Sequence, residues 1–387
     1  MPRLNIYDPR ERAVVRVADA LLAPAALRRR PARGSAPSRI LCLRLERIGD
    51  LLMTLPALAE LRALNPAAEI DLVVGSWNAD LAGAIASVSR VEVVDAAWLS
   101  RDARAGLSPF ALVTRARHWR ARRYDLAINF EPDIRTNLAL AFAGAGRTAG
   151  FASGGGGPLL DLAVDYDASA HTADNAVALV RAAMNAAAGE RPPDARLAIP
   201  DEHRRRAAAL LAPLGTAVVV GVHVSGGRAV KQWPEARFRE VAQSLARDRS
   251  AGIVLTGSPA DARQIAEVRD ALPAGRVVDL SQGTDLLTVA AVIERLHLFV
   301  TGDTGPMHLA QAVGTPIIAI FGPSDPRRYA PRGTSDTVVR VDLPCSPCNR
   351  IRLPPARCTG HTPACLTGIE TAHVLAAIDE VLGSRAR

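Results

Sequence analysis

Lysine is almost absent from this sequence, and aromatic residues are scarce. Of the 47 basic residues only Lys231 is a lysine, and the other 46 are arginines. Because every other basic residue is arginine, the single lysine favours a point-charge contact between the Lys231 ammonium and a phosphate. Aromatic side chains make up 4% of the 387 residues, which leaves few side chains for stacking nucleic-acid bases.

Long apolar runs are missing as well. A membrane-spanning helix needs roughly 18 apolar residues, and the best stretch, residues 51–64, is interrupted by one proline and two charged side chains. Arg12 and Arg16 interrupt the first apolar stretch, and the arginine cluster at 28–30 follows that stretch instead of preceding it, unlike a secretory signal. We therefore expect a cytoplasmic protein that does not span a membrane.

The basic charge balance indicates an anionic partner. A net charge of +8 suits nucleic acid, a phosphorylated substrate or an acidic membrane surface, and charge alone does not choose among them. A nucleic-acid-binding protein is therefore an alternative, but no recognition motif supports it and we expect no nucleic-acid partner. Residues 1–38 form a basic arm with an amphipathic helix over Val14–Leu27, which could contact an anionic membrane surface, pack on the domain or stay loose.

The length and the order of apolar segments predict two α/β domains with parallel sheets. Residues 190–200, which hold three prolines, read as the linker, and residues 153–158, with four consecutive glycines, read as a mobile loop. A helix is expected over 50–64 and another over 369–382, the latter crossing back to the first domain. The strands are expected at 39–45, 70–75, 91–95 and 124–130, then at 217–224, 252–256, 277–280, 298–301 and 316–321.

Ligands of open α/β sheets bind just past the carboxyl ends of strands, and a first such segment is Arg47-Ile48-Gly49-Asp50. Gly49 allows a close backbone approach, and Asp50 could project into the cleft as a general base. Aspartate is also a preferred helix N-cap, so Asp50 could equally be a capping residue. On position alone the cap is favoured.

A second segment, residues 223–234, is a Gly-rich turn that ends in Lys231-Gln232-Trp233-Pro234. Free N–H groups of such a turn with a following cation could hold a diphosphate without a metal. The segment could also be an ordinary loop between a strand and a helix, with Trp233 as a hydrophobic staple. The solitary lysine favours the phosphate interpretation.

Two more segments follow predicted strands. In residues 301–308 an anion site is expected at a helix start, with Asp303, Thr304, Gly305 and His308 as candidate ligand-binding residues, although a simple capped helix would explain Asp303 and Thr304. In residues 256–261, Gly257 and Asp261 could serve a ribose hydroxyl, or Asp261 could be a cap.

The cysteines divide into two groups. Cys42 lies inside a predicted strand and reads as a small buried hydrophobe. The other four can hold one tetrahedral metal ion with a structural role, zinc or iron, or remain as reduced thiols without a metal; they are Cys345, Cys348, Cys358 and Cys365.

Taken together, these segments resemble glycosyltransferase family 9, the ADP-heptose:lipopolysaccharide heptosyltransferase family. The resemblance spans residues 39–382 and depends on the order and spacing of four motifs, with the tetracysteine segment similar to one in part of that family. The motifs are residues 47–58 (RIGDLLMTLPAL), 231–234 (KQWP), 302–310 (GDTGPMHLA) and 321–324 (FGPS).

The resemblance implies a GT-B fold, in which two Rossmann-like domains face a central cleft. The expected arrangement is a basic arm at 1–38, an acceptor-binding domain at 39–190, a nucleotide-sugar-binding domain at 191–368 with the tetracysteine segment at 345–365, and a C-terminal helix at 369–387. The resemblance also implies that Asp50 is the catalytic base, that Lys231 contacts the donor diphosphate, and that residues 303–308 bind the nucleotide sugar. It further places Ser225 and Gly226 near the donor phosphates, where Gly226, without a hydroxyl, would contribute its backbone N–H.

The chemistry agrees with an inverting glycosyltransferase. The attacking hydroxyl needs one carboxylate as base, and a departing nucleoside diphosphate needs charge stabilisation but no acid, unlike the paired carboxyls of a glycoside hydrolase. The predicted reaction moves a sugar, heptose from ADP-heptose, to a hydroxyl of a lipopolysaccharide-core or related glycan, without a cofactor for catalysis and with peripheral contact at the inner membrane. An epimerase with a GT-B fold is a further alternative.

Overall fold

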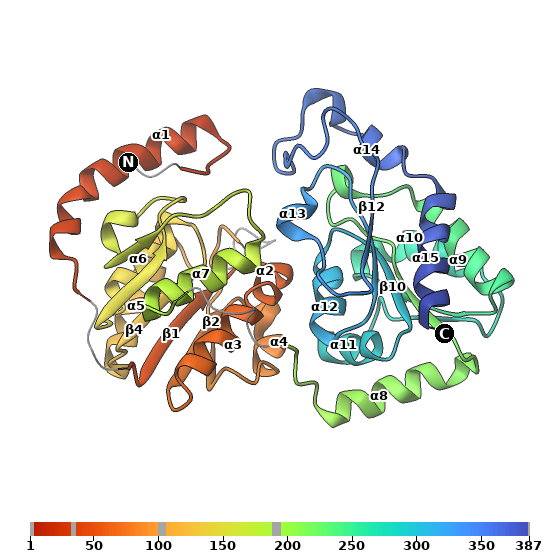
Figure 1. The fold of residues 1–387 in the computed structure, drawn as a ribbon, viewed down its shortest axis with the longest axis horizontal. Helices are drawn as coiled ribbons and strands as arrows, with labels where there is room; N and C mark the ends of the chain where they lie inside the picture. Colours follow the sequence, from red (N-terminus) through yellow and green to blue (C-terminus); the bar gives the residue numbers. More distant parts are fainter. Residues whose placement is uncertain (1–3, 32–35, 100–105, 188–194, 386–387) are drawn as a thin grey trace. The chain divides into compact units, whose positions relative to one another are not determined.

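The computed structural model describes residues 4–31, 36–99, 106–187 and 195–385. The chain divides into two compact units, Met1–Ala195 and Arg196–Arg387. Each unit is a parallel sheet with helices on both faces, as Figure 1 shows. Residues 190–194 of the expected linker lie outside the described residues.

The first unit is built on a six-stranded sheet of order β3-β2-β1-β4-β5-β6, in which every paired strand is parallel. Helices α3 and α7 pack together beside the sheet, and α5 packs on α6. The strands are β1 (Arg39–Arg44), β2 (Glu69–Val74), β3 (Arg90–Val93), β4 (Leu126–Asn129), β5 (Arg147–Phe151) and β6 (Leu162–Val164). The helices are α1 (Pro9–Leu22), α2 (Ile48–Leu52), α3 (Leu55–Leu64), α4 (Ala79–Gly83), α5 (Pro109–His118), α6 (Ile134–Phe142) and α7 (Thr172–Met184).

The second unit repeats this strand order, because β12-β11-β10-β7-β8-β9 places its six strands in the same sequence of neighbours. This is the strand order of a complete doubly wound, dinucleotide-binding fold. The strands are β7 (Val219–His223), β8 (Gly252–Thr256), β9 (Val277–Asp279), β10 (Leu298–Gly302), β11 (Ile317–Ile320) and β12 (Thr337–Val339). The helices are α8 (Asp201–Leu211), α9 (Glu235–Asp248), α10 (Ala262–Arg269), α11 (Leu286–Glu294), α12 (Gly305–Val313), α13 (Pro326–Tyr329), α14 (Ala364–Thr367) and α15 (Thr371–Arg385).

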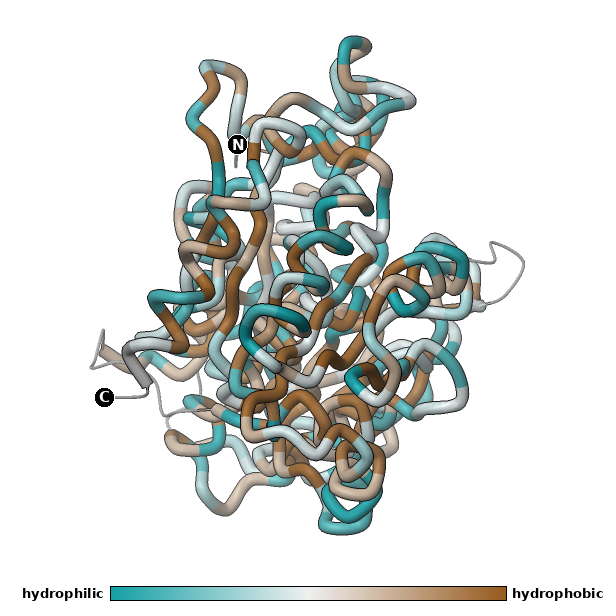
Figure 2. The backbone as a smooth tube through the Cα atoms, turned by 90° about the vertical axis from the view of Figure 1, so that its right-hand side faces the viewer, coloured by the Kyte–Doolittle hydropathy of each residue, from teal (hydrophilic) through white to brown (hydrophobic). Residues whose placement is uncertain are grey.

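The central strands form the two cores. Strands of a parallel sheet are covered on both faces, so they read as continuous apolar runs, and all five residues of β8 and of β10 are buried. In Figure 2 the apolar strands, drawn brown, run through the interior, whereas hydrophilic residues gather on the outer helices. Cys42 is fully buried in β1, as expected for a small core residue. None of the described helices is long and apolar enough to cross a membrane.

Three expectations about the elements are wrong. The helix expected over 50–64 is two helices, because α2 ends at Leu52 and α3 starts at Leu55 with Pro56 in its first turn. The glycine-rich stretch 153–157 is buried against α1 instead of forming a mobile loop. The last helix, α15, does not cross back: its buried residues, among them Val374 and Ile378, pack in the core of the second unit.

Candidate functional site

Both sheets have a topological switch point, where the strand order reverses and the loops at the carboxyl edge separate to leave room for a ligand. In the first unit this point lies between β1 and β4, and in the second between β7 and β10. Asp50 lies in the segment after β1. Lys231 lies in the segment after β7 and Asp303 directly after β10, so the predicted residues occupy the two switch points.

The second unit brings Lys231 and Asp303 into direct contact. The Lys231 ammonium lies 2.7 Å from a carboxylate oxygen of Asp303, and both side chains are largely buried. Burial alone would raise the pKa of Asp303, but the Lys231 charge and hydrogen bonds from Lys231 and Ser324 hold that pKa below its ordinary value. The pair is therefore an ionised carboxylate beside an ammonium, at the switch point of its sheet.

Helix α12 begins beside this pair. Thr304 is its N-cap, but the Thr304 hydroxyl bonds back to Thr301 and to the Gly302 carbonyl and makes no capping bond to the first turn. Pro306 lies in that first turn, and His308 is buried. The N-terminal N–H groups that a capping side chain would otherwise occupy suit an anion. A simple side-chain-capped helix is thus not what this segment forms.

The turn after β7 differs from the expectation of free N–H groups. The Gly226 N–H donates to the side-chain oxygen of Gln232, and the Gly227 N–H donates to the Ser225 hydroxyl at 3.2 Å. The Gln232 amide in turn donates to the Val224 carbonyl, so this side chain satisfies two polar groups of a partly buried backbone. A Cβ at Gly226 would lie 2.7 Å from the Gln232 backbone, which explains the glycine by close packing.

Asp261 has a local structural role. Its carboxylate accepts hydrogen bonds from the Ser258 N–H at 2.8 Å and the Ser258 hydroxyl at 2.6 Å, which completes a capping box at residues 258–261. Burial raises the pKa of Asp261, yet bonds from Ser258 and Ser225 hold it below its ordinary value. Asp261 is therefore the N3 residue of a capping box whose N-cap is Ser258, and Gly257 is packed against Ile265.

His223 was missed by the sequence reasoning. It ends β7, is buried, and hydrogen-bonds Thr256 at 3.0 Å. Burial lowers the pKa of His223 to about 4, so the imidazole is neutral near neutral pH. Gln232 and Ser324 lie in the KQWP and FGPS motifs but were missed too. Only the folded structure shows that Gln232 bonds Gly226 and that Ser324 bonds Asp303.

In the first unit Asp50 is not the cap of its helix. Arg47 is the N-cap of α2, so Gly49 and Asp50 are its second and third residues. The Asp50 carboxylate lies 3.6 Å from the Arg44 guanidinium and is one-third exposed. Its backbone carbonyl accepts bonds from Arg44 and Thr54. The carboxylate is therefore held beside a cation but remains accessible to solvent.

Arg44 is buried among carboxylates. Its side chain is 4% exposed and lies 3.0 Å from the Glu46 carboxylate. Glu131, at the carboxyl end of β4, is also buried, and one of its oxygens accepts the Leu45 and Glu46 N–H groups. Burial and the Glu46 charge raise the pKa of Glu131 to about 8, against the attraction of Arg44. This network fixes the backbone between β1 and α2.

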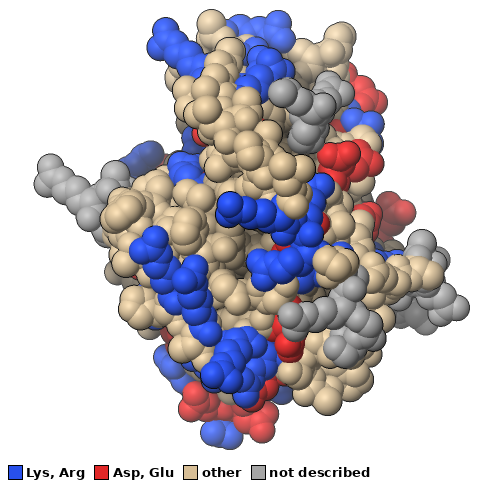
Figure 3. Space-filling model, turned by 90° about the vertical axis from the view of Figure 1, so that its left-hand side faces the viewer, with Lys and Arg blue, Asp and Glu red and all other residues tan. Residues whose placement is uncertain are grey.

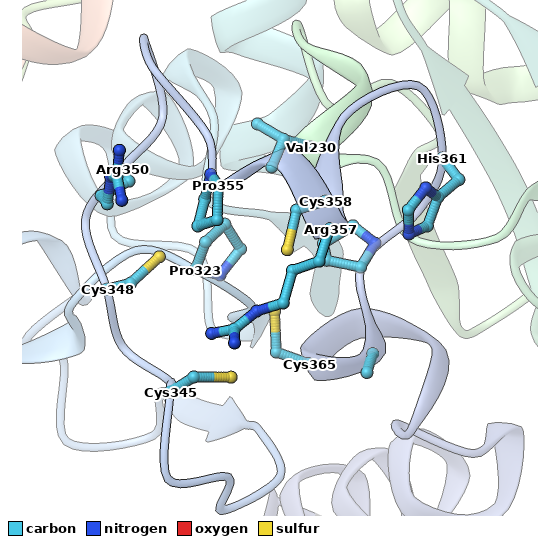
Figure 4. A pocket seen from close by; sticks show the side chains of 12 residues that line it. Val230, Pro323, Cys345, Cys348, Arg350, Pro355, Arg357, Cys358, His361 and Cys365 are labelled. Atoms are coloured by element: carbon cyan, nitrogen blue, oxygen red, sulfur yellow. The ribbon is translucent and has the colours of Figure 1, made fainter.

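The four clustered cysteines line one cavity in the second unit. Their sulfur atoms point toward a common space, as Figure 4 shows, and Val230 and Pro323 belong to the same lining. Burial, together with the other three thiols, raises the pKa of Cys365 to about 11. As placed, no three His, Cys, Asp or Glu side chains of the described ranges have the arrangement of a metal site, so metal binding stays a prediction.

Sequence comparison identifies relatives over part of the chain. The family model described as Glycosyltransferase family 9 (heptosyltransferase) matches residues 113–354. Lipooligosaccharide heptosyltransferase 2 of Haemophilus influenzae is 33% identical over 114 residues. That match covers 29% of this chain and 33% of the relative, so the aligned stretch spans about a third of the relative's length.

Structure comparison covers nearly the whole chain. The structure of E. coli ADP-heptose lps heptosyltransferase II has a TM-score of 0.74 and 22% identity, and the match covers 90% of this chain and 100% of that one. The iron-containing dodecameric glycosyltransferase TibC from enterotoxigenic E. coli has a TM-score of 0.55 and 14% identity, over 91% of this chain and 78% of that one. At these identities the similarity establishes the fold, which is GT-B.

Proposed function

Since this chain belongs to glycosyltransferase family 9, the heptosyltransferase family, we propose that it transfers heptose from ADP-heptose to a hydroxyl of a lipopolysaccharide-core glycan or a related acceptor. The donor is the one for which the E. coli structural relative is named, and the acceptor class is the one for which the Haemophilus relative is named. Both are assignments by analogy, because a fold of this kind serves many sugars.

The observation that carries the proposal is the Lys231–Asp303 pair at the start of α12. An ammonium at 2.7 Å from a carboxylate, next to a helix N-terminus without a side-chain cap, is a site at which a diphosphate can bind. The same site supplies positive charge to a departing diphosphate. We therefore assign Lys231, Asp303, Thr304, Gly305 and His308 to the donor.

We assign the remaining residues to the donor by their position relative to this site. Ser225 and Gly226 lie in the turn that leads to Lys231, and Gly257 and Asp261 follow the adjacent strand β8. Because Ser225 bonds Asp261, the two loops would move together when a ribose or phosphate binds. Gly226 would contribute its N–H only after Gln232 releases it.

The proposed mechanism is a direct displacement with inversion. The acceptor hydroxyl oxygen forms the new bond to the anomeric carbon while the bond from that carbon to the diphosphate oxygen breaks, and Asp50 accepts the hydroxyl proton. The diphosphate leaves with its charge stabilised by Lys231 and the first turn of α12, so the step calls for neither a general acid nor a metal ion.

A structural metal at the cysteine cavity is a separate proposal. Four cysteines line this cavity, and burial and the other three thiols raise the pKa of Cys365, so a cation would stabilise the set as thiolates. The iron in the name of the structural relative TibC supports iron beside zinc as the candidate. The residues that would hold the ion are Cys345, Cys348, Cys358 and Cys365, and its contribution would be to the fold of that segment.

The proposal is tested with ADP-heptose, a lipopolysaccharide-core acceptor and two variants. Asp50→Asn should lower turnover by about 100-fold or more and leave ADP affinity unchanged, since it removes only the base. Lys231→Met should weaken ADP binding in calorimetry by about 2 kcal/mol or more, with thermal unfolding as the control for folding. Unchanged turnover in Asp50→Asn, or isomerised donor without transfer, would discard the assignment.

A further inference from the structure

The N-terminal helix exposes a row of large apolar side chains. Nine large hydrophobic residues are exposed among the described residues, and five of them lie between residues 7 and 27. Val14, Val17 and Leu21 are 69%, 62% and 78% exposed, and their spacing of three and four residues places them on one face of α1. Tyr7 and Leu27 extend the exposed apolar surface beyond the two ends of the helix.

The opposite face of α1 is already attached to the first unit. Val15 is buried and packs on Gly155, where a Cβ would lie 2.3 Å from its methyl group. Asp19 accepts the Gly156 N–H at 2.6 Å, and the Arg30 N–H donates to Asp161 at 2.7 Å. Because these contacts fix the rotation of the helix, the apolar row faces solvent and cannot turn into the core of its own unit.

The exposed row is accompanied by basic charge. Six arginines and three acids lie between residues 7 and 30. Two of the acids are occupied, since Asp8 caps α1 and Asp19 bonds Gly156. Arg10, Arg16, Arg28 and Arg29 are exposed, and basic side chains gather on the face of the molecule shown in Figure 3. An apolar stripe with arginines around it matches a bilayer of anionic lipids, in which apolar side chains enter the acyl boundary and cations meet headgroups.

We propose that the outward face of residues 7–29 is a docking surface for an anionic lipid bilayer, and we call it the arm surface. Nucleic acid would use the arginines but would leave the aliphatic row without a role. A bilayer uses both components of the surface. The arm surface lies on α1 and includes none of the residues assigned to the donor or the base. The first unit can therefore stay on a membrane while no sugar is bound.

The test is flotation of the full-length protein with phosphatidylcholine vesicles, with and without phosphatidylglycerol. The protein should float with the anionic vesicles and not with the neutral ones, and added salt should release part of it. The double variant Val17→Asp/Leu21→Asp should reduce the floating fraction by about tenfold. Arg28→Glu/Arg29→Glu should reduce it too, by weakening attraction to the headgroups.

Phe110→Asp is the matched control, because Phe110 is 80% exposed at the start of α5 and lies outside the arm surface. It should float like the parent protein. Equal thermal unfolding of all variants excludes misfolding. No flotation, flotation that ignores Val17→Asp/Leu21→Asp, or a dimer that the same substitutions dissociate would overturn the proposal. None of these measurements needs donor or acceptor, so their failure leaves the proposed transfer untouched.

Discussion

Glu131 is a buried carboxyl that holds the backbone in front of Asp50. It bonds the Leu45 and Glu46 N–H groups and lies in the same network as Arg44. Its pKa is raised from 4.5 to about 8 by burial first and by Glu46 second. A carboxyl that keeps its proton in the folded protein can still accept hydrogen bonds from backbone N–H groups. Because it adds no full negative charge beside Arg44, the Arg44 guanidinium remains available to pair with Glu46 and Asp50.

This raised pKa predicts a pH dependence of stability. At pH values between the pKa of Glu131 in the unfolded chain and its raised pKa in the folded protein, the folded state binds more protons than the unfolded state. Glu131 therefore contributes its full stabilisation below the unfolded pKa, and this stabilisation is lost as the pH rises through the folded pKa. Glu131→Gln keeps the size and an acceptor oxygen but does not titrate. As the pH rises from roughly 5 to 8, the free energy of unfolding of the variant, measured in urea titrations, should increase by about 1 kcal/mol or more relative to that of the parent. An equal difference at both pH values would contradict the raised pKa.

At single positions, the sequence located the candidate residues better than it assigned their local roles. Asp50 was favoured as a cap, but the cap is Arg47, because capping depends on the residue at which the helix starts. The N–H of Gly226 was expected to be free, but a side chain six residues along the chain occupies it. Hydrogen bonds of this kind depend on rotamers, which a residue pattern does not encode.

At the scale of elements, the cysteine segment supports the loop that follows β11. The Cys348 and Asn349 N–H groups donate to the Pro323 carbonyl at 3.1 and 2.8 Å. The Ser346 hydroxyl donates to the Gly322 carbonyl at 2.8 Å. Ser324, the next residue, bonds Asp303. The segment therefore bears on Asp303, a residue proposed to bind the donor, through the backbone of residues 322–324.

The metal proposal predicts a measurable composition. Protein purified without chelator should contain about one zinc or iron ion per chain by mass spectrometry, and Cys345→Ser/Cys348→Ser should lose it. The same variant should unfold several degrees lower, by about 5 °C, because the segment loses its crosslink. Cys42→Ala, which changes the cysteine in β1, should keep the ion. A parent protein with only trace metal would contradict the proposal.

The elements that the sequence predicted well are the buried strands with continuous apolar runs. β8 has the expected bounds, residues 252–256, since five apolar or small residues end at a glycine turn. β5, β6 and β12 were not expected, because β6 and β12 are short edge strands and β5 (RTAGF) holds a single large apolar residue, so all three carry a weak apolar signal. The buried glycines at 153–157 were read as mobile because their partner, α1, is distant in sequence and leaves no local trace.

At the scale of the whole molecule, the proposed transfer needs one half of its chemistry from each of the two units. The first holds a carboxylate beside Arg44, at the switch point between β1 and β4. The second holds Lys231 and Asp303 at the equivalent point of its own sheet. Transfer requires the base of one unit and the phosphate site of the other to act on the same sugar.

The most direct measurement is a crystal structure of the protein with a non-transferable analogue of ADP-heptose. The account predicts that the diphosphate contacts the Lys231 ammonium and the first N–H groups of α12, while the Asp50 carboxylate faces the anomeric carbon. A diphosphate bound away from Lys231, or an Asp50 carboxylate turned from the sugar, would contradict the shared site.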